Sequence, residues 1–121
     1  MKACDREKVG SHGLEVTRLG LGGTTFGNMY SALEEQEGLD VIDASYNAGV
    51  RYFDTAPLYG YGLSEARMGP GLARYDRDEI AISSKVGYML KERQEGDDYV
   101  ELFVDAPKLT SYFDYSRDAV L

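Results

Sequence analysis

The sequence predicts an α/β protein whose strands alternate with helices and pair in a parallel sheet. β-branched and aromatic residues cluster at 50–54 and 80–86, and segments with helical periodicity lie before and between these two stretches. This alternation is typical of parallel sheets. A closed (β/α)8 barrel takes roughly 250 residues, so 121 residues would hold less than half of one. We therefore expect a single partial domain over 1–121, the N-terminal portion of a barrel, with a hairpin and about three βα units.

Composition excludes several classes of protein. Hydrophobic residues make up 43% and charged residues 28% of the chain, as in globular proteins, and the net charge is −8. No window approaches the ~18 apolar residues of a membrane span, and no apolar stretch follows the charged N-terminus, so we expect a cytoplasmic protein away from membranes. The acidic balance and scattered basic residues disfavour nucleic acid. Cys4 and His12 are the only residues of their kinds, which excludes an internal disulfide and a Cys/His zinc cluster.

The first half of the chain predicts a hairpin, a glycine-rich loop and a helix. Residues 8–21 read as two extended segments around the turn Ser11-His12-Gly13. Ser31 and Glu34 have the spacing of a capping box, so the helix is expected to open at Ser31 and to stop at Gly49. The apolar stripe that faces the core consists of Leu39, Ile42 and Tyr46.

The second half predicts two further strands and a second helix. A strand over 50–54 precedes a helix that begins at Ser64. Pro70 lies inside this helical pattern, where the lost hydrogen bond and the ring clash cost about 3 kcal/mol, so we expect a kink or split near 68–69. Residues 80–86 give the clearest strand of the sequence.

Three ionisable residues follow the ends of the predicted strands. Asp54 ends one strand, Lys85 lies near the end of the next, and Tyr59 follows Asp54 in its loop. Catalytic groups of α/β barrels gather at the carboxyl ends of strands, so these three are expected to converge. An ammonium stabilises a phenolate and a carboxylate holds an ammonium, a combination suited to proton exchange with a carbonyl/alcohol pair. Taken singly, each has a structural interpretation: turn closure for Asp54, loop packing for Tyr59 and a solvated strand end for Lys85.

Four motifs surround these residues: Arg18-Leu19-Gly20-Leu21-Gly22-Gly23, Asp54-Thr55-Ala56-Pro57-Leu58-Tyr59-Gly60, Gly62-Leu63-Ser64-Glu65 and Ile82-Ser83-Ser84-Lys85-Val86-Gly87. Over roughly residues 9–121 the chain resembles the aldo-keto reductase superfamily. Its bacterial sugar (D-threo-aldose or fucose) and pyridoxal dehydrogenases are the most similar branch, including Phe113-Asp114-Tyr115-Ser116. The resemblance implies a (β/α)8 barrel whose N-terminal hairpin closes its floor. It also implies a nicotinamide cofactor bound at the strand ends without a Rossmann domain.

The resemblance implies a role for each site residue. Tyr59 is then the general acid/base, Lys85 tunes the acidity of its phenol, and Asp54 pairs with Lys85. The family's catalytic histidine follows a fourth strand and is absent from this chain; His12 belongs to the hairpin at the opposite end. The residues that match the region near the nicotinamide of NAD or NADP are Asp54, Gly22, Gly23 and Thr24.

The segment 87–115 is long and mixed, with a strand-like patch at 99–104. Loops beyond about 12–15 residues are usually functional or disordered. Because this one leaves the strand that carries Lys85, we expect it to overhang the active site. Packing of the loop onto the barrel is an equally open interpretation of its aromatic residues. The residues expected to line a substrate pocket are Tyr88, Tyr99 and Phe103.

The implied function is that of an NAD(P)-dependent oxidoreductase that moves hydride between nicotinamide and a carbonyl or hemiacetal carbon of a sugar or small aldehyde. One alternative is a nicotinamide-binding barrel that acts as a regulatory partner subunit. Another is a truncated product, inactive without the remainder of the barrel.

Two other motifs do not support the functions that they superficially indicate. The loop at 20–25 lacks the third glycine of a dinucleotide fingerprint, and Ser64, without a preceding strand or a downstream histidine, is a helix cap rather than a nucleophile.

Overall fold

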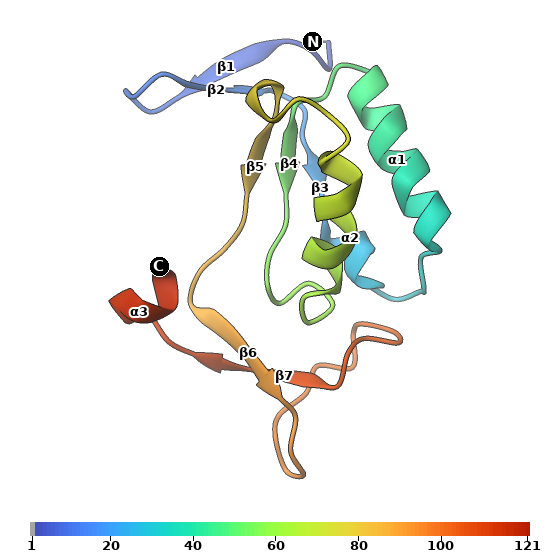
Figure 1. Ribbon diagram of the computed structural model, residues 1–121, viewed down its shortest axis with the longest axis vertical. Helices are drawn as coiled ribbons and strands as arrows, with labels where there is room; N and C mark the ends of the chain where they lie inside the picture. Colours follow the sequence, from blue (N-terminus) through green and yellow to red (C-terminus); the bar gives the residue numbers. More distant parts are fainter. Residues whose placement is uncertain (1) are drawn as a thin grey trace.

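A computed structural model describes residues 2–121 and shows a parallel sheet with two helices on one face (Figure 1). The sheet contains β3 (Leu21–Gly22), β4 (Tyr52–Asp54) and β5 (Ala81–Ser83), in that order. The helices are α1 (Glu35–Asn47) and α2 (Leu63–Leu72). Each helix connects one strand to its parallel neighbour, which confirms the predicted strand and helix alternation.

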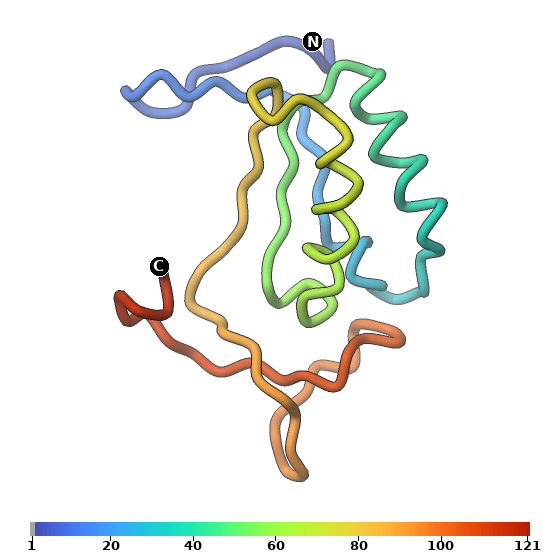
Figure 2. The backbone as a smooth tube through the Cα atoms, in the orientation of Figure 1, coloured from blue at the N-terminus to red at the C-terminus, as the bar shows by residue number. Residues whose placement is uncertain are grey.

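Two antiparallel hairpins lie at opposite ends of this sheet (Figure 2). β1 (Arg6–Val9) and β2 (Leu14–Thr17) lie at the end where the parallel strands begin. β6 (Tyr88–Glu92) and β7 (Leu109–Phe113) cross below the end where those strands finish. Within residues 2–121, no helix has the length and apolarity to span a membrane. The short elements are the 3-10 helices η1 (Thr24–Gly27) and η2 (Arg77–Glu79), and α3 (Arg117–Val120).

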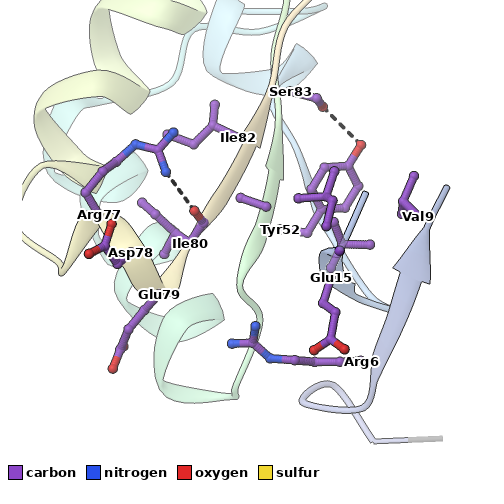
Figure 3. Close-up of a pocket in the computed structure, with 14 residues that line it drawn as sticks. Arg6, Val9, Glu15, Tyr52, Arg77, Asp78, Glu79, Ile80, Ile82 and Ser83 are labelled. Atoms are coloured by element: carbon purple, nitrogen blue, oxygen red, sulfur yellow. Dashed lines mark hydrogen bonds between the residues drawn. The ribbon is translucent and has the colours of Figure 1, made fainter. Parts of the chain in front are cut away.

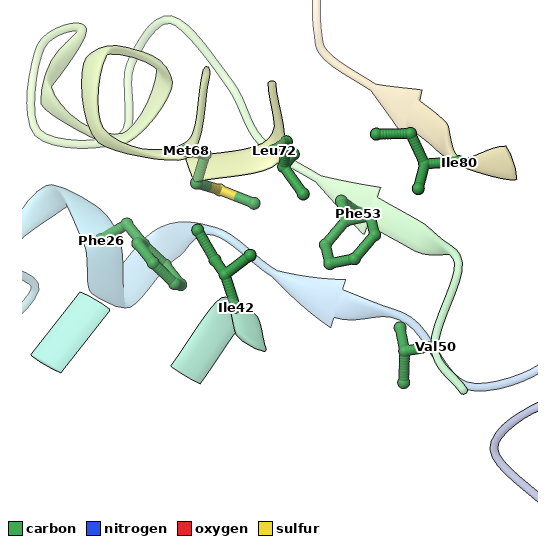
Figure 4. Packing of buried hydrophobic residues seen from close by; sticks show 7 residues of the cluster. All are labelled: Phe26, Ile42, Val50, Phe53, Met68, Leu72 and Ile80. Carbon is green, nitrogen blue, oxygen red and sulfur yellow. The ribbon is translucent and has the colours of Figure 1, made fainter. Parts of the chain in front are cut away.

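The hydrophobic core lies between the sheet and the two helices (Figure 4). Side chains alternate across a strand, so Phe53 of β4 turns into this core, whereas Tyr52 and Asp54 lie on the opposite face of the sheet. Fully burying a large apolar side chain such as Phe53 contributes about 1.5–3 kcal/mol. The buried members of the core are Phe26, Ile42, Val50, Phe53, Met68, Leu72 and Ile80.

The sequence predicts the end of α1 correctly but not its start. Gly49 has a φ of +98°, a conformation that glycine favours, and the helix stops there as expected. The expected capping box at Ser31 does not form, and α1 begins at Glu35. The Leu33 N–H donates instead to Asn28 Oδ1 at 2.9 Å, an oxygen to which Arg67 of α2 also donates, and the backbone at Glu34 is extended.

Helix α2 corrects two expectations. Its first residue is Leu63, and Ser64 is a fully buried residue of the first turn rather than a cap. The Ser64 hydroxyl donates to the carbonyl of Gly23 at 2.7 Å and lies 2.9 Å from Thr55 Oγ1. The helix is not split at Pro70. Pro70 is exposed and lies two residues before the last residue of the helix. Its missing N–H removes one hydrogen bond, but the Ala73 N–H still reaches the Gly69 carbonyl at 2.9 Å.

Three further expectations concern the hairpins and the last helix. Of the two extended segments expected at 8–21, the first ends β1 and the second divides into β2 and β3, because β2 pairs with β1 and β3 pairs with β4. The patch at 99–104 is not a strand; the strands β6 and β7 lie on either side of it. It contacts the earlier loop instead, where the Val104 N–H donates to the Asn28 carbonyl at 2.9 Å. Ser116 caps α3, as predicted, by accepting from the Ala119 N–H at 3.3 Å.

We predict that Ser64→Ala destabilises the protein, because it leaves the Gly23 carbonyl and the Thr55 hydroxyl without their buried partner. The expected loss is about 1–3 kcal/mol in the free energy of unfolding, measured by urea denaturation. Ser31→Ala is the control, since Ser31 is exposed and caps no helix, and it should change that free energy by less than about 0.5 kcal/mol. Equal effects of the two substitutions would contradict this assignment.

Candidate functional site

The carboxyl ends of β4 and β5 bring Asp54, Lys85 and Tyr59 together. Asp54 is the last residue of β4, and Lys85 follows the end of β5. The Lys85 ammonium donates to Asp54 Oδ2 at 2.7 Å and to the Thr55 carbonyl at 2.9 Å. The same ammonium lies 4.7 Å from the centroid of the Tyr59 ring. These three side chains therefore form one contiguous charged group.

The loop after β4 holds Tyr59 through backbone contacts. The Tyr59 carbonyl accepts from the Ser64 N–H at 3.1 Å, so the first turn of α2 fixes it. The next residue, Gly60, has a φ of +63° and packs against Gly27, where a Cβ would lie 2.5 Å from the Gly27 carbonyl oxygen. Only glycine meets both requirements. The position of Tyr59 thus depends on the close approach of two glycines.

Two residues of the site escape sequence analysis. Ser83 donates its hydroxyl to Asp54 Oδ1 at 2.6 Å, and Tyr52 OH lies 3.0 Å from the Ser83 oxygen. The available signal is alternation: Tyr52 and Asp54 share a face of β4, and the parallel register pairs Asp54 with Ser83. Without the register, Ser83 is one of many strand serines and threonines.

The charges of Asp54 and Lys85 stabilise each other. Partial burial raises the pKa of Asp54, but hydrogen bonds from Lys85 and Ser83 and the charge of Lys85 outweigh it, so the pKa lies below its usual value. Partial burial lowers the pKa of Lys85, but the contacts with Asp54 and Tyr59 outweigh it and raise the pKa above its usual value. Both groups are charged at neutral pH. The Asp54 contribution to stability is therefore present above its ordinary pKa and is lost as the pH falls through its lowered value.

The three residues expected near the cofactor differ in accessibility. Gly22 is exposed beside Asp54, and a Cβ there would meet nothing within 4 Å. Gly23 is buried, and a Cβ there would lie 2.7 Å from the Asp54 carbonyl oxygen and 2.8 Å from Ser64 Oγ. Thr24 is half-buried at the start of η1. Gly22 thus leaves open space at the site, whereas Gly23 is required by packing.

The aromatic residues of 87–115 divide into two groups. Tyr88 lines a hollow of ≈160 Å³ together with Tyr59 and Lys85. Tyr99 stacks on Tyr61 with ring centroids 5.1 Å apart, and Phe103 meets the edge of the same ring at 6.2 Å. Tyr99 and Phe103 do not line that hollow, because the buried Tyr61 ring holds them. For these two residues the packing interpretation describes the structure.

A larger hollow of ≈690 Å³ lies between the β1–β2 hairpin and β5 (Figure 3). Its lining includes Tyr52 and Ser83 but neither Tyr59 nor Lys85. It is open because, within residues 2–121, β5 pairs only with β4. His12 lies in the turn of that hairpin, at the end of the sheet where the parallel strands begin, whereas Lys85 follows the opposite end of β5. In the described part of the chain, no group of three or more His, Cys, Asp or Glu could hold a metal ion.

Comparison with known proteins identifies a match over residues 18–105 to the Aldo/keto reductase family. D-threo-aldose 1-dehydrogenase of Pseudomonas sp is 45% identical over 83 residues, which cover 69% of this chain and 25% of that protein. Pyridoxal 4-dehydrogenase of Microbacterium luteolum is 36% identical over 96 residues, covering 79% and 28%. A solved aldo-keto reductase from Bacillus halodurans, in its holo form, superposes with a TM-score of 0.69 at 25% identity, covering 97% and 33%. The chain therefore spans about a quarter of the length of these two curated relatives.

We predict that Lys85→Met raises the pKa of Asp54, because it removes a hydrogen bond and a positive charge from the carboxylate. Titration of the Asp54 carboxyl carbon by NMR measures this change. Lys91→Met is a matched control, since it breaks the separate ion pair between Lys91 and Asp97. The control should raise the pKa of Asp97 and leave that of Asp54 unchanged. An Asp54 titration that is identical with and without Lys85 would contradict the ion pair.

Proposed function

Because the chain belongs to the aldo/keto reductase family, we propose that Tyr59, Lys85 and Asp54 are the proton-transfer group of an NAD(P)-dependent oxidoreductase. The reaction moves hydride between the nicotinamide and a carbonyl or hemiacetal carbon. The names of the aldose and pyridoxal dehydrogenase relatives support a sugar or small aldehyde as substrate. This activity is proposed for the whole protein, of which residues 1–121 supply these three groups.

The observation that carries the proposal is the Lys85 ammonium, which contacts both the Asp54 carboxylate and the Tyr59 ring. Reduction of a carbonyl needs a proton at the carbonyl oxygen, and the Tyr59 hydroxyl is the donor. The phenolate left on Tyr59 is stabilised by the Lys85 charge, and Asp54 keeps Lys85 charged and in place. In the oxidation direction the same phenolate accepts the proton from the alcohol.

A nicotinamide cofactor fits the chemistry of this end of the sheet. A Cβ at Gly22 would meet nothing within 4 Å, so the backbone beside Asp54 is accessible to a bound group. Gly22, Thr24 and Asp54 would hold the nicotinamide end. Bound there, the cofactor supplies or accepts the hydride, while Tyr59 handles the proton.

Within residues 2–121, β5 is an edge strand that pairs only with β4. This free edge supports a site that is completed by further strands. Ile82 of β5 is 41% exposed, although its register partner Phe53 is fully buried beneath the helices. A further helix on the face that α1 and α2 occupy would cover Ile82. Strands beyond β5 would carry the remaining contacts, including the histidine that the family places after its fourth strand.

We predict that Tyr59→Phe lowers turnover about 10²–10⁴-fold, because it removes only the hydroxyl that exchanges the proton. Steady-state reduction of an aldose or aldehyde and fluorescence titration with NADH and NADPH measure turnover and cofactor affinity, and the affinity should remain. Lys85→Met should reduce the same step, and Asp54→Asn should have an intermediate effect because it loosens Lys85 without removing its charge. Tyr30→Phe, at an exposed tyrosine outside the site, is the control. Near-normal turnover in Tyr59→Phe would return Tyr59 to a packing role.

We also predict that Tyr88→Leu raises KM several-fold, because Tyr88 lines the hollow beside Tyr59 and Lys85. The loss of its edge contact with the Phe113 ring should lower the free energy of unfolding by only about 0.5–1.5 kcal/mol. Tyr99→Leu should show the opposite result, since Tyr99 stacks on Tyr61: a lower free energy of unfolding and an unchanged KM. Kinetics and urea denaturation of both variants separate the two roles. A KM effect confined to Tyr99→Leu would reverse the assignment.

A further inference from the structure

We propose that Ser83 and Tyr52 are positioning residues that fix the orientation of the Asp54 carboxylate and, through it, of Lys85. The proposal rests on the proposed function, because the orientation of Lys85 matters only if Lys85 acts on Tyr59. Neither residue contacts Tyr59 in the structure. Both act through Asp54. Hydrogen bonds join Tyr52 to Ser83 and Ser83 to Asp54 in a row on the face of the sheet opposite the core.

The two oxygens of Asp54 have different partners. Oδ2 accepts from the Lys85 ammonium at 2.7 Å, and Oδ1 accepts from the Ser83 hydroxyl at 2.6 Å. A carboxylate held at one oxygen can turn about its last torsion, which is broad and shallow. A second hydrogen bond, at the other oxygen, fixes the plane of the carboxylate. That plane, together with the Thr55 carbonyl that accepts from Lys85 at 2.9 Å, sets where the Lys85 ammonium lies relative to the Tyr59 ring.

The direction of the hydrogen bonds follows from the number of protons. A serine hydroxyl has a single proton, and an ionised carboxylate has none to donate. The Ser83 proton therefore points to Asp54, and its oxygen is left to accept. Tyr52 OH lies 3.0 Å from that oxygen and is consequently the donor (Figure 3). The row thus runs in one direction, from Tyr52 through Ser83 to the carboxylate.

Packing holds the Tyr52 ring in the place this row requires. Tyr52 and Asp54 share one face of β4, and the register Asp54↔Ser83 brings the serine beside the carboxylate. The backbone of Gly20 lies against the ring, where a Cβ would be 2.7 Å from Tyr52 Cδ1. Gly20 therefore restricts movement of the Tyr52 ring on that side, whereas Tyr52 also lines the ≈690 Å³ hollow. The groups that face the Asp54 carboxylate are Lys85, Ser83 and, through Ser83, Tyr52, while β3 presents only Gly22 on its other side.

The test compares Ser83→Ala with its neighbour Ser84→Ala in the protein. Ser84 donates its hydroxyl to Glu65 Oε1 at 2.7 Å and does not contact Asp54, so it is a matched control. NMR titration of the Asp54 carboxyl carbon needs no turnover and gives the first readout. Ser83→Ala should raise the pKa of Asp54, Tyr52→Phe should raise it less, and Ser84→Ala should leave it unchanged. Ser83→Thr, which keeps a hydroxyl, should restore the titration of the unmodified protein.

The second readout is the pH dependence of kcat. Ser83→Ala should lower kcat about tenfold, in keeping with the loss of a hydrogen bond to a charged group, and leave KM nearly unchanged. It should also move the acidic limb of the profile to higher pH, because the rate falls where Asp54 takes up a proton. Gly20→Ala, which displaces the Tyr52 ring, should act in the same direction as Tyr52→Phe.

Each outcome decides the proposal. An Asp54 titration that responds equally to Ser83→Ala and Ser84→Ala would overturn it, as would a shifted titration with an unmoved pH profile in an active enzyme. If the protein shows no oxidoreductase activity while the titration shifts as expected, the proposed function fails and the hydrogen-bond row stands. Should Ser83→Ala fail to fold, Tyr52→Phe and Ser83→Thr carry the same comparison.

Discussion

The parallel register of β3, β4 and β5 is the constraint on which the rest of the site depends. It sets Gly22, Asp54 and Ser83 in one row across the carboxyl ends of the strands. The open backbone of Gly22 lies on one side of the carboxylate and the hydroxyl of Ser83 on the other. A shift of one residue in the register would turn Asp54 toward the core and Phe53 toward the site, because side chains alternate across a strand. The burial of Phe53 therefore orients the end of the sheet that carries Asp54 as well as stabilising the fold.

Close backbone contacts connect this core to the site. Gly23 lies where any side chain would meet the Asp54 carbonyl and Ser64, and Gly60 lies where any side chain would meet Gly27. Both contacts bring the start of α2 against the loops after β3 and β4. The buried hydroxyl of Ser64 satisfies the Gly23 carbonyl at the same point, so the polar groups left by the close approach are paired. The loop that carries Tyr59 is thereby held by packing as well as by its own turn hydrogen bonds, such as the one from the Tyr59 N–H to the Ala56 carbonyl at 3.1 Å.

The long segment after β5, residues 87–115, is joined to the sheet and helices through Asn28. Its side-chain amide donates to the Val104 carbonyl at 2.9 Å, and its side-chain oxygen accepts from the Leu33 N–H and from Arg67. One buried residue thus joins the entry of α1, the surface of α2 and the segment before β7. Tyr99 and Phe103 of this segment pack on Tyr61, and Tyr88 of the same segment lies next to Tyr59. Within residues 87–115, Tyr88 is the residue that lines the hollow beside Tyr59 and Lys85.

The sequence by itself determined the features that depend on local chemistry. The alternation of strands and helices, the end of α1 at Gly49 and the position of Asp54 at a strand end follow from periodicity and backbone preference. The positions of Asp54, Tyr59 and Lys85 at or after predicted strand ends also predicted that these three residues would converge. Tertiary structure decided every feature in which distant groups compete for one partner. Asn28 takes the Leu33 N–H and displaces the cap at Ser31, and Gly23 draws Ser64 into the core. Ser83 joins the site only through the strand register, because a hydroxyl becomes a partner of a carboxylate only when pairing brings the two chains within hydrogen-bond distance.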